Sequence, residues 1–248
     1  MNRLIRTEFL KLRTTRVSLV AFGAGPILCT LVTIAVFSSA GHQGNEKLGP
    51  QSLVAAVGAP ASIITAVALL LGVLGTAGEY RHQTITTTLL ATPRRRDVVT
   101  AKLIAYALVG AAMASATVVT AVAIAVPWLH SAGVNVHVGG DVARVALGFV
   151  ASTALYSGMG VTIGALVRNQ TAAIAAVLIW LLAVEGLLGN VFRSARFLEW
   201  LPVAVGRSAV RLESVAGALP VWSALLVLGG YVTVFAIASN RFVTRDVT

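Results

Sequence analysis

The amino-acid sequence predicts an all-α membrane protein with six transmembrane helices. Of its 248 residues, 57% are hydrophobic and only 11% are charged, and the hydrophobic residues gather into six long runs. Soluble domains carry about 25% charged residues, whereas a run of about 20 apolar residues crosses the hydrocarbon of a bilayer as a helix. We therefore expect a single transmembrane domain over residues 1–248, embedded in a lipid membrane.

The positions of the spans follow from the apolar runs. The expected spans are residues 17–38, 53–78, 99–126, 142–167, 171–190 and 221–239. The first run, Val17 to Phe37, resembles a signal peptide, but signal peptides have apolar segments of only about 7–15 residues, so a retained span is the better interpretation. Pro60 is tolerable near the outer end of the second span, and Pro127 is expected to close the third.

The fourth and fifth spans are expected to form a helical hairpin. The tight turn Arg168-Asn169-Gln170 joins them, and Asn169 can cap the fifth helix. Gly160 and Gly164 lie one helical turn apart in the fourth span, which predicts a close contact with a neighbouring helix.

The basic residues predict the orientation of the chain. Most of the 19 Lys and Arg residues fall in residues 1–16, in residues 79–102, at Arg168 and in the C-terminal tail. Cytoplasmic segments carry an excess of Lys and Arg, so we expect a multi-pass protein of the cell (plasma) membrane with both termini in the cytoplasm. The net charge of +10 does not indicate nucleic-acid binding, because the basic residues border apolar runs instead of forming a groove.

Residues 2–16 are too charged to insert and predict an interfacial amphipathic helix on the cytoplasmic leaflet. Its apolar residues would share one side: Met1, Ile5, Phe9 and Leu12. A basic anchor with no further role is the alternative.

The polar passage 78–97 separates the second span from the third. His82, Ile85 and Leu89 are spaced to share one side of a short helix, which Pro93 would stop. A helix lying on the inner face, rather than a plain loop, predicts a docking surface for a partner.

The outer segment 191–220 interleaves aromatic and apolar residues with arginines. This pattern favours re-entrant or interfacial helices at the outer leaflet, broken at Pro202. A segment that crosses the membrane, and so reverses the last span, is the alternative.

Glu185 is the one ionisable residue deep in an expected span. Because a charge in the membrane is costly, it should face a polar cavity or a partner. It can line a substrate path; the alternatives are an anchor paired with an arginine from 193–211 and a protonated acid at a helix contact.

Sequence patterns for enzyme chemistry do not occur. The chain contains no Gly-x-x-x-x-Gly-Lys-[Ser/Thr] and no His-Glu-x-x-His sequence, so we expect no catalysis and no cofactor or metal in this chain. His130 and His137 are better interpreted as solvated loop residues than as a metal site. Cys29, the only cysteine, is expected to be a small buried apolar residue.

Four segments resemble the permeases of ABC-2 type transporters. They are residues 78–95, with Gly78-Glu79-Tyr80-Arg81 and Pro93-Arg94-Arg95, the amphipathic start at 8–13, the hairpin turn at 164–172, and Trp200-Leu201-Pro202. The resemblance follows the chain in order over nearly its whole length.

The resemblance implies a transmembrane subunit that pairs with a second permease copy or a paralogue and with two ABC ATPase subunits. ATP and Mg²⁺ would be bound by the ATPase partners. It also implies that the N-terminal helix and the segment after the second span, the coupling helix, contact the ATPase. The residues expected to dock or couple are Phe9, Glu79, Arg81, His82, Ile85 and Leu89.

The expected function is therefore the permease of an ABC exporter. A membrane anchor or sensor that uses the same ATPase without transport is the first alternative. A secondary transporter is the second, although such proteins usually carry several intramembrane charges or paired broken helices.

Overall fold

The computed structural model describes residues 2–39, 48–49, 51–82, 95–136, 139–192, 196–210 and 219–245. These residues form helices and short connections without a strand, which confirms the all-α class. The helices are α1 Asn2–Thr14, α2 Arg16–Ser39, α3 Ser52–Gly58, α4 Ala61–Arg81, α6 Arg95–Ser131, α7 Gly140–Val167, α8 Gln170–Ile179, the π-helix η1 Trp180–Val184, α9 Glu185–Val191, the 3₁₀ helix η2 Arg196–Trp200, α10 Pro202–Val210 and α11 Val221–Arg245.

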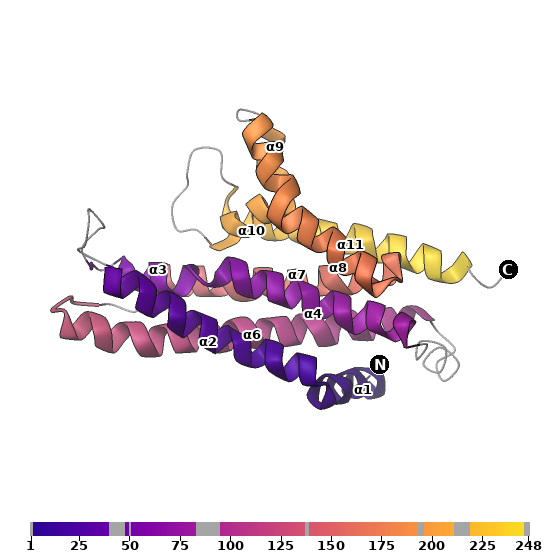
Figure 1. Cartoon of the computed structure of the whole chain (residues 1–248), viewed down its shortest axis with the longest axis horizontal. Coiled ribbons are helices and arrows are strands. Elements are labelled where there is room, and N and C mark those ends of the chain that lie inside the picture. Colours follow the sequence, from indigo (N-terminus) through magenta and orange to yellow (C-terminus); the bar gives the residue numbers. More distant parts are fainter. Residues whose placement is uncertain are drawn as a thin grey trace.

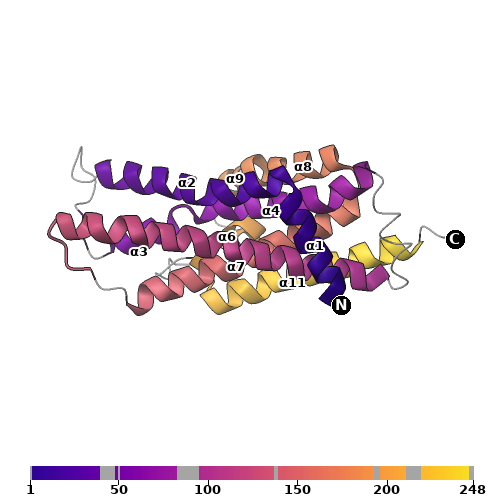
Figure 2. The same cartoon turned by 90° about the horizontal axis from the view of Figure 1, so that it is seen from below.

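Six stretches of the described chain are long and apolar enough to cross a membrane. They are Ser18–Ser39, Ser52–Arg81, Asp97–Ser131, Gly140–Val167, Gln170–Val191 and Val221–Ser239. Most of the helices run along one long axis, and the start of α1 and the end of α11 lie toward the same end of it (Figures 1 and 2). We call this the termini end of the bundle. An even number of crossings accounts for the shared position of the two ends.

Proline affects two of these spans differently. The second span is divided, because α3 ends at Gly58 and Pro60 is the N-cap of α4. The expectation that Pro127 closes the third span is wrong, since α6 continues through it to Ser131. Proline removes one backbone hydrogen bond, and a long apolar helix tolerates that loss where its neighbours support it.

The most extensive helix contact joins α4 to α7. A Cβ atom on Gly72 would lie 2.2 Å from the carbonyl oxygen of Ser157, and one on Gly160 would lie 2.0 Å from that of Leu69. Only glycine allows two backbones to approach this closely. The expected contact at Gly160 is therefore confirmed, and the α4–α7 pair forms the centre of the bundle.

The fifth span leaves this centre. It runs from α8 through η1 to α9, and α9 projects away from the rest of the molecule (Figure 1). Helix α10 packs on α7 and α11 and fully buries Val205 and Ala209. Pro202 begins α10, a position where its fixed φ angle suits a helix.

Candidate functional site

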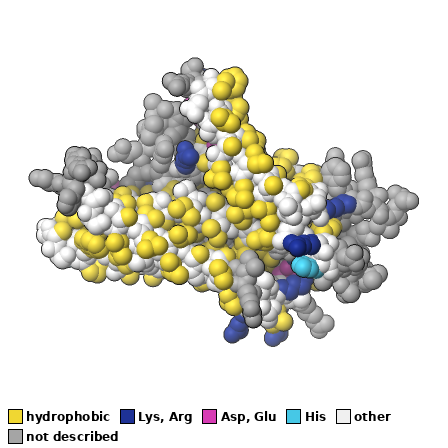
Figure 3. All heavy atoms as spheres, viewed as in Figure 1, with side chains coloured by type: hydrophobic (Ala, Val, Ile, Leu, Met, Phe, Trp, Pro, Cys, Tyr) yellow, Lys and Arg dark blue, Asp and Glu magenta, His cyan; other side chains and the backbone are white. Residues whose placement is uncertain are grey.

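Three successive residues end helix α4, and they contact parts of the chain on two different sides of it. Glu79 faces α1 and α6, whereas Tyr80 and Arg81 face the turn between α7 and α8. Neighbouring helical residues point about 100° apart, so three in a row can reach separate partners. Acidic, basic and histidine side chains gather near this end, whereas the long face is mostly hydrophobic (Figure 3).

Glu79 belongs to a ring of four charged side chains, which we call the charge cluster: Glu8, Lys11, Glu79 and Lys102. Lys102 Nζ lies 2.7 Å from Glu8 Oε2 and 2.9 Å from Glu79 Oε1. Lys11 Nζ closes the ring, 2.9 Å from Glu8 Oε1 and 2.8 Å from Glu79 Oε1. The side chain of Lys102 is 3% exposed, and that of Lys11 is 41% exposed. Two carboxylates and two ammonium groups balance, so burial leaves no ion uncompensated.

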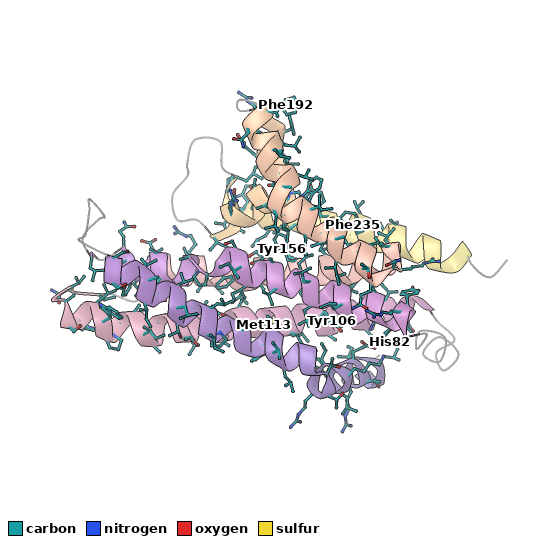
Figure 4. All side chains as sticks on the ribbon, viewed as in Figure 1. His82, Tyr106, Met113, Tyr156, Phe192 and Phe235 are labelled. Atoms are coloured by element: carbon teal, nitrogen blue, oxygen red, sulfur yellow. The ribbon has the colours of Figure 1, made fainter. Side chains whose placement is uncertain are left out.

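Tyr106 lies beneath the ammonium group of Lys102. Lys102 Nζ is 5.7 Å from the centroid of the Tyr106 ring, within the range of a cation–π contact, and 3.4 Å from the carbonyl oxygen of Gly75. A Cβ atom on Gly75 would fall 1.6 Å from the Tyr106 hydroxyl oxygen. Glycine at this position thus lets Tyr106 of α6 pass under the end of α4 (Figure 4).

The pKa values of the two α1 members, Glu8 and Lys11, both favour the charged form. Burial raises the pKa of Glu8, but the positive charges of Lys102 and Lys11 outweigh it and hold that pKa below the ordinary 4.5. Burial lowers the pKa of Lys11, but hydrogen bonds and charges from Glu79 and Glu8 outweigh it and raise that pKa above the ordinary 10.5. Near neutral pH both side chains therefore stay charged.

The other side of α4 is fixed by the α7–α8 turn. The guanidinium carbon of Arg168 lies 5.9 Å from the centroid of the Tyr80 ring, and Arg81 Nη1 donates to Gln170 Oε1 at 3.3 Å. Arg168 has a φ of 55° at the C-cap of α7, a left-handed conformation that is costly for a residue with a Cβ atom. Asn169 caps α8 through its side chain, as expected.

The residues expected to dock on a partner occupy different situations. Phe9 is 37% exposed on α1, next to Leu10, which is 62% exposed. His82 is exposed in the turn that ends α4. Ile85, Leu89 and the helix expected after the second span lie outside the described residues, so the docking role stays a prediction.

Three members of the charge cluster, Glu8, Lys11 and Lys102, were not recognised in the sequence as site residues. Glu8 lies on the packed face of α1 with Leu12, one turn away, and both are buried. The expected apolar side of α1 thus differs from the observed one, which includes Glu8 and leaves Phe9 exposed. Lys102, 94 residues from Glu8, was counted only as a cytoplasmic charge. The available signal was a single acidic residue in an otherwise basic helix.

Glu185 binds the N-terminus of α10. Its Oε2 accepts a hydrogen bond from the Val203 amide at 3.0 Å, and its Oε1 accepts one from the Ala204 amide at 2.6 Å. Such first amides of a helix have no partner within the helix, and the positive end of the helix dipole favours a carboxylate. Within the described residues Glu185 forms no ion pair with an arginine. Its place in a pathway stays a prediction.

Two tyrosines donate hydrogen bonds to the backbone where α10 begins. The Tyr156 hydroxyl donates to the carbonyl oxygen of Pro202, and the Tyr231 hydroxyl donates to that of Trp200 at 2.8 Å. Together with Glu185 they fix the elbow between η2 and α10 from three other helices. We call Glu185, Tyr156 and Tyr231 the α10 latch; Figure 4 shows Tyr156 where α7 meets this segment.

The comparison with known families decides what kind of protein carries this arrangement. The family model of the ABC-2 family transporter protein matches residues 4–185, which include α1 to α8 and the whole charge cluster. The chain belongs to the ABC-2 transporter family. This ABC-2 protein is a permease-type, multi-pass membrane subunit. A search of curated proteins found no match.

The described residues of this ABC-2 protein offer no group of three His, Cys, Asp or Glu side chains that could hold a metal ion. His137, one half of the possible histidine pair, lies outside them. Cys29 is fully buried and donates to the carbonyl oxygen of Thr117 at 3.5 Å. Its environment is that of a small buried residue.

Proposed function

We propose that this ABC-2 protein is the permease of an ABC exporter, which forms a translocation pathway as a dimer and is driven by two separate ATPase subunits. ATP and Mg²⁺ belong to the ATPase subunits in this proposal, because the chain has no phosphate-binding Gly-x-x-x-x-Gly-Lys-[Ser/Thr] sequence, and the permease is not itself an enzyme. In this proposal the protein lies in the cell membrane with its termini end on the cytoplasmic side, because basic residues are in excess on that side.

The charge cluster is the observation that carries the proposal. It joins α1, the end of α4 and the start of α6 through largely buried ion pairs, and residues 83–94 begin just beyond it. An exposed ion pair between long side chains contributes little free energy and separates easily. Separating a buried pair leaves an uncompensated charge in the interior, which strongly destabilises the protein. A displacement of α1 is therefore passed to the second and third spans. Closure of the ATPase dimer on ATP would move α1 and residues 81–92 together and open the pathway outward.

Separate residues would dock the ATPase and transmit its movement. Ile85 and Leu89 are expected to enter a cleft on the ATPase, where each contributes about 1.5–3 kcal/mol if fully covered. The exposed Phe9 on α1 offers a further apolar contact. Glu79 and Arg81 set the direction of the chain after α4 through their contacts with neighbouring helices.

The test is co-purification with the cognate ATPase, followed by ATP hydrolysis and solute flux in liposomes. Ile85→Asp or Leu89→Asp should weaken recovery of the ATPase, because a carboxylate would be buried unpaired. Thr87→Asp, which adds the same charge on the opposite side of the expected helix, is the matched control. Glu79→Ala should leave the complex assembled but uncouple hydrolysis from flux. Full assembly and full flux in both aspartate variants would refute the docking role.

Two further outcomes separate the remaining parts of the proposal. A complex that assembles and hydrolyses ATP without moving any solute would identify an anchor or sensor subunit instead of an exporter. For the orientation, with Cys29 replaced, single cysteines at Gln43 and Ser131 should label from outside intact cells, and a cysteine at Thr248 should not.

A further inference from the structure

Two cavities border the α10 latch. One of about 520 Å³ lies between α3, α4 and α10; we call it the α4–α10 cavity. The other, of about 350 Å³, lies among α7, α8, η1 and α11; we call it the α7–α11 cavity. Tyr156 and Leu181 line both, so these side chains form a shared wall. Each volume lies in the range of about 300–1,000 Å³ that is usual for small-molecule sites.

The α4–α10 cavity carries a positive charge without a described counter-ion. Arg207 of α10 lines it, among mostly small side chains such as Ala59 and Ser62. Arg207 forms no ion pair with any residue that the structure describes. Arg207 is exposed, so its guanidinium group is accessible to a ligand. A guanidinium group binds carboxylates and phosphates through two parallel hydrogen bonds, so an anionic group suits this cavity.

The α7–α11 cavity is apolar. Its lining includes Leu69, Met159, Ile163, Val177, Leu201 and Phe235. Trp180 also lines this cavity, and its indole N–H is buried without a hydrogen-bond partner among the described residues. Trp180 begins the π-helical turn η1, and such turns are frequent at functional sites. An apolar chain fits this environment.

The latch stands between the two environments. The bond from the Tyr156 hydroxyl to the Pro202 carbonyl fixes the tyrosine in the shared wall. Gly206 of α10 makes this possible, because a Cβ atom there would lie 2.5 Å from the Tyr156 hydroxyl oxygen. A ligand that occupies both cavities has to displace the Tyr156 side chain from the shared wall. This displacement breaks the hydrogen bond to the Pro202 carbonyl, and the net free energy of one such bond is small.

We propose that the two cavities form one binding site for a single-chain anionic amphiphile. Its apolar part enters the α7–α11 cavity, and its acidic group binds Arg207 of the α4–α10 cavity. The inference names a substrate class for the proposed exporter and rests on that function only in calling the ligand a transported solute. Binding itself needs no ATPase, so it can be measured on the permease alone.

The test uses a variant that retains Trp180 as the single tryptophan, with the three others replaced by phenylalanine. The protein is placed in nanodiscs of zwitterionic lipid and titrated with dibromostearate, whose bromine atoms quench a nearby indole. We expect saturable quenching of Trp180 by dibromostearate, and weaker binding of the uncharged dibromostearyl alcohol. Non-saturable quenching, or equal binding of the acid and the alcohol, would overturn the proposal. So would equal quenching by brominated phosphatidylglycerol, which would identify a lipid contact.

Two variants locate the ligand within the site. Arg207→Gln should weaken dibromostearate binding by about tenfold, the scale of one lost charge-assisted hydrogen-bond pair, and leave the alcohol unchanged. Arg144→Gln, at an exposed arginine outside both cavities, is the matched control and should change neither. Ile163→Phe, which narrows the α7–α11 cavity, should weaken both probes. Wild-type binding in either Arg207→Gln or Ile163→Phe would refute the proposed site. Intact binding without ATPase-driven flux would refute the exporter and leave the site standing.

Discussion

Replacement of Lys102 by methionine should destabilise the protein more than any other single change in the charge cluster. Lys102 is 3% exposed and bridges Glu8 and Glu79 at 2.7 and 2.9 Å. Without it the two carboxylates share only Lys11, whose side chain is 41% exposed. Removing one partner of a buried pair costs about 3–5 kcal/mol. Removing Lys11, which is screened by solvent, should cost no more than about 1 kcal/mol.

These costs translate into a measurable difference in melting temperature. A chain of this size changes its Tm by about 2–4 °C per kcal/mol, so Lys102→Met should melt about 6–20 °C lower. Lys11→Met should melt within about 4 °C of the parent. The assay is thermal unfolding of the purified protein in nanodiscs, followed by tryptophan fluorescence. Adding Glu8→Gln to Lys102→Met should recover part of the loss, since one uncompensated carboxylate disappears. Equal and small shifts in the two lysine variants would show that the cluster does not hold α1 to the bundle.

Three further predictions concern the charge cluster, the α4–α7 contact and the α10 latch. Because the folded-state pKa of Glu8 is lowered, its stabilisation is complete above its ordinary pKa of 4.5 and is lost as the pH falls further; Glu8→Gln should therefore flatten the acid limb of a Tm–pH curve. Because the folded-state pKa of Lys11 is raised, the stabilisation by its positive charge is complete below pH 10.5 and is lost as the pH rises above that value. Gly160→Ala should force α4 and α7 apart and cost about 1–3 kcal/mol or more, whereas Gly229→Ala, with open space around it, should keep the parent Tm. Glu185→Leu should lower thermal stability by about 1–2 kcal/mol through loss of two cap bonds, and Glu185→Gln should lose less because its amide oxygen still accepts one.

The fold was predictable because a bilayer restricts the length and composition of every segment that crosses it. Any segment that crosses the hydrocarbon must be long, apolar and helical, so composition alone located the six spans. The predicted end of the third span at Pro127 was wrong. The penalty of Pro127 inside α6 depends on how the neighbouring helices support the weakened turn, which is a tertiary property and leaves no local signal.

The candidate site was only partly predictable. Glu79 was recognisable as an acid at the foot of a span. Its expected role, to fix the angle between the coupling helix and the second span, stays a prediction, because residues 83–94 lie outside the described residues. Its partners were not recognisable, because Lys11 and Lys102 reach it from α1 and α6, which meet α4 only in the folded protein. Glu185 was recognised by the cost of a charge in a span, but its actual partners are backbone amides. Backbone donors carry no residue identity, so no sequence pattern could have named them.

The charge cluster and the α10 latch are attached to the same pair of helices at different levels of the bundle. The cluster holds the end of α4 through Glu79, and the latch holds α10 to α7 through Tyr156. Between them α4 and α7 meet backbone to backbone at Gly72 and Gly160, where no side chain can repack to absorb a displacement. We therefore expect the pair to move as one body, so that a shift of α4 at the termini end carries α7 with it. A shift of α7 must then either carry α10 along through the Tyr156–Pro202 hydrogen bond or break that bond, and breaking it releases the Tyr156 part of the wall between the two cavities. In the proposed exporter, coupling between the ATPase and the proposed ligand site would thus require no chain of side-chain rearrangements, only that this glycine contact stays intact.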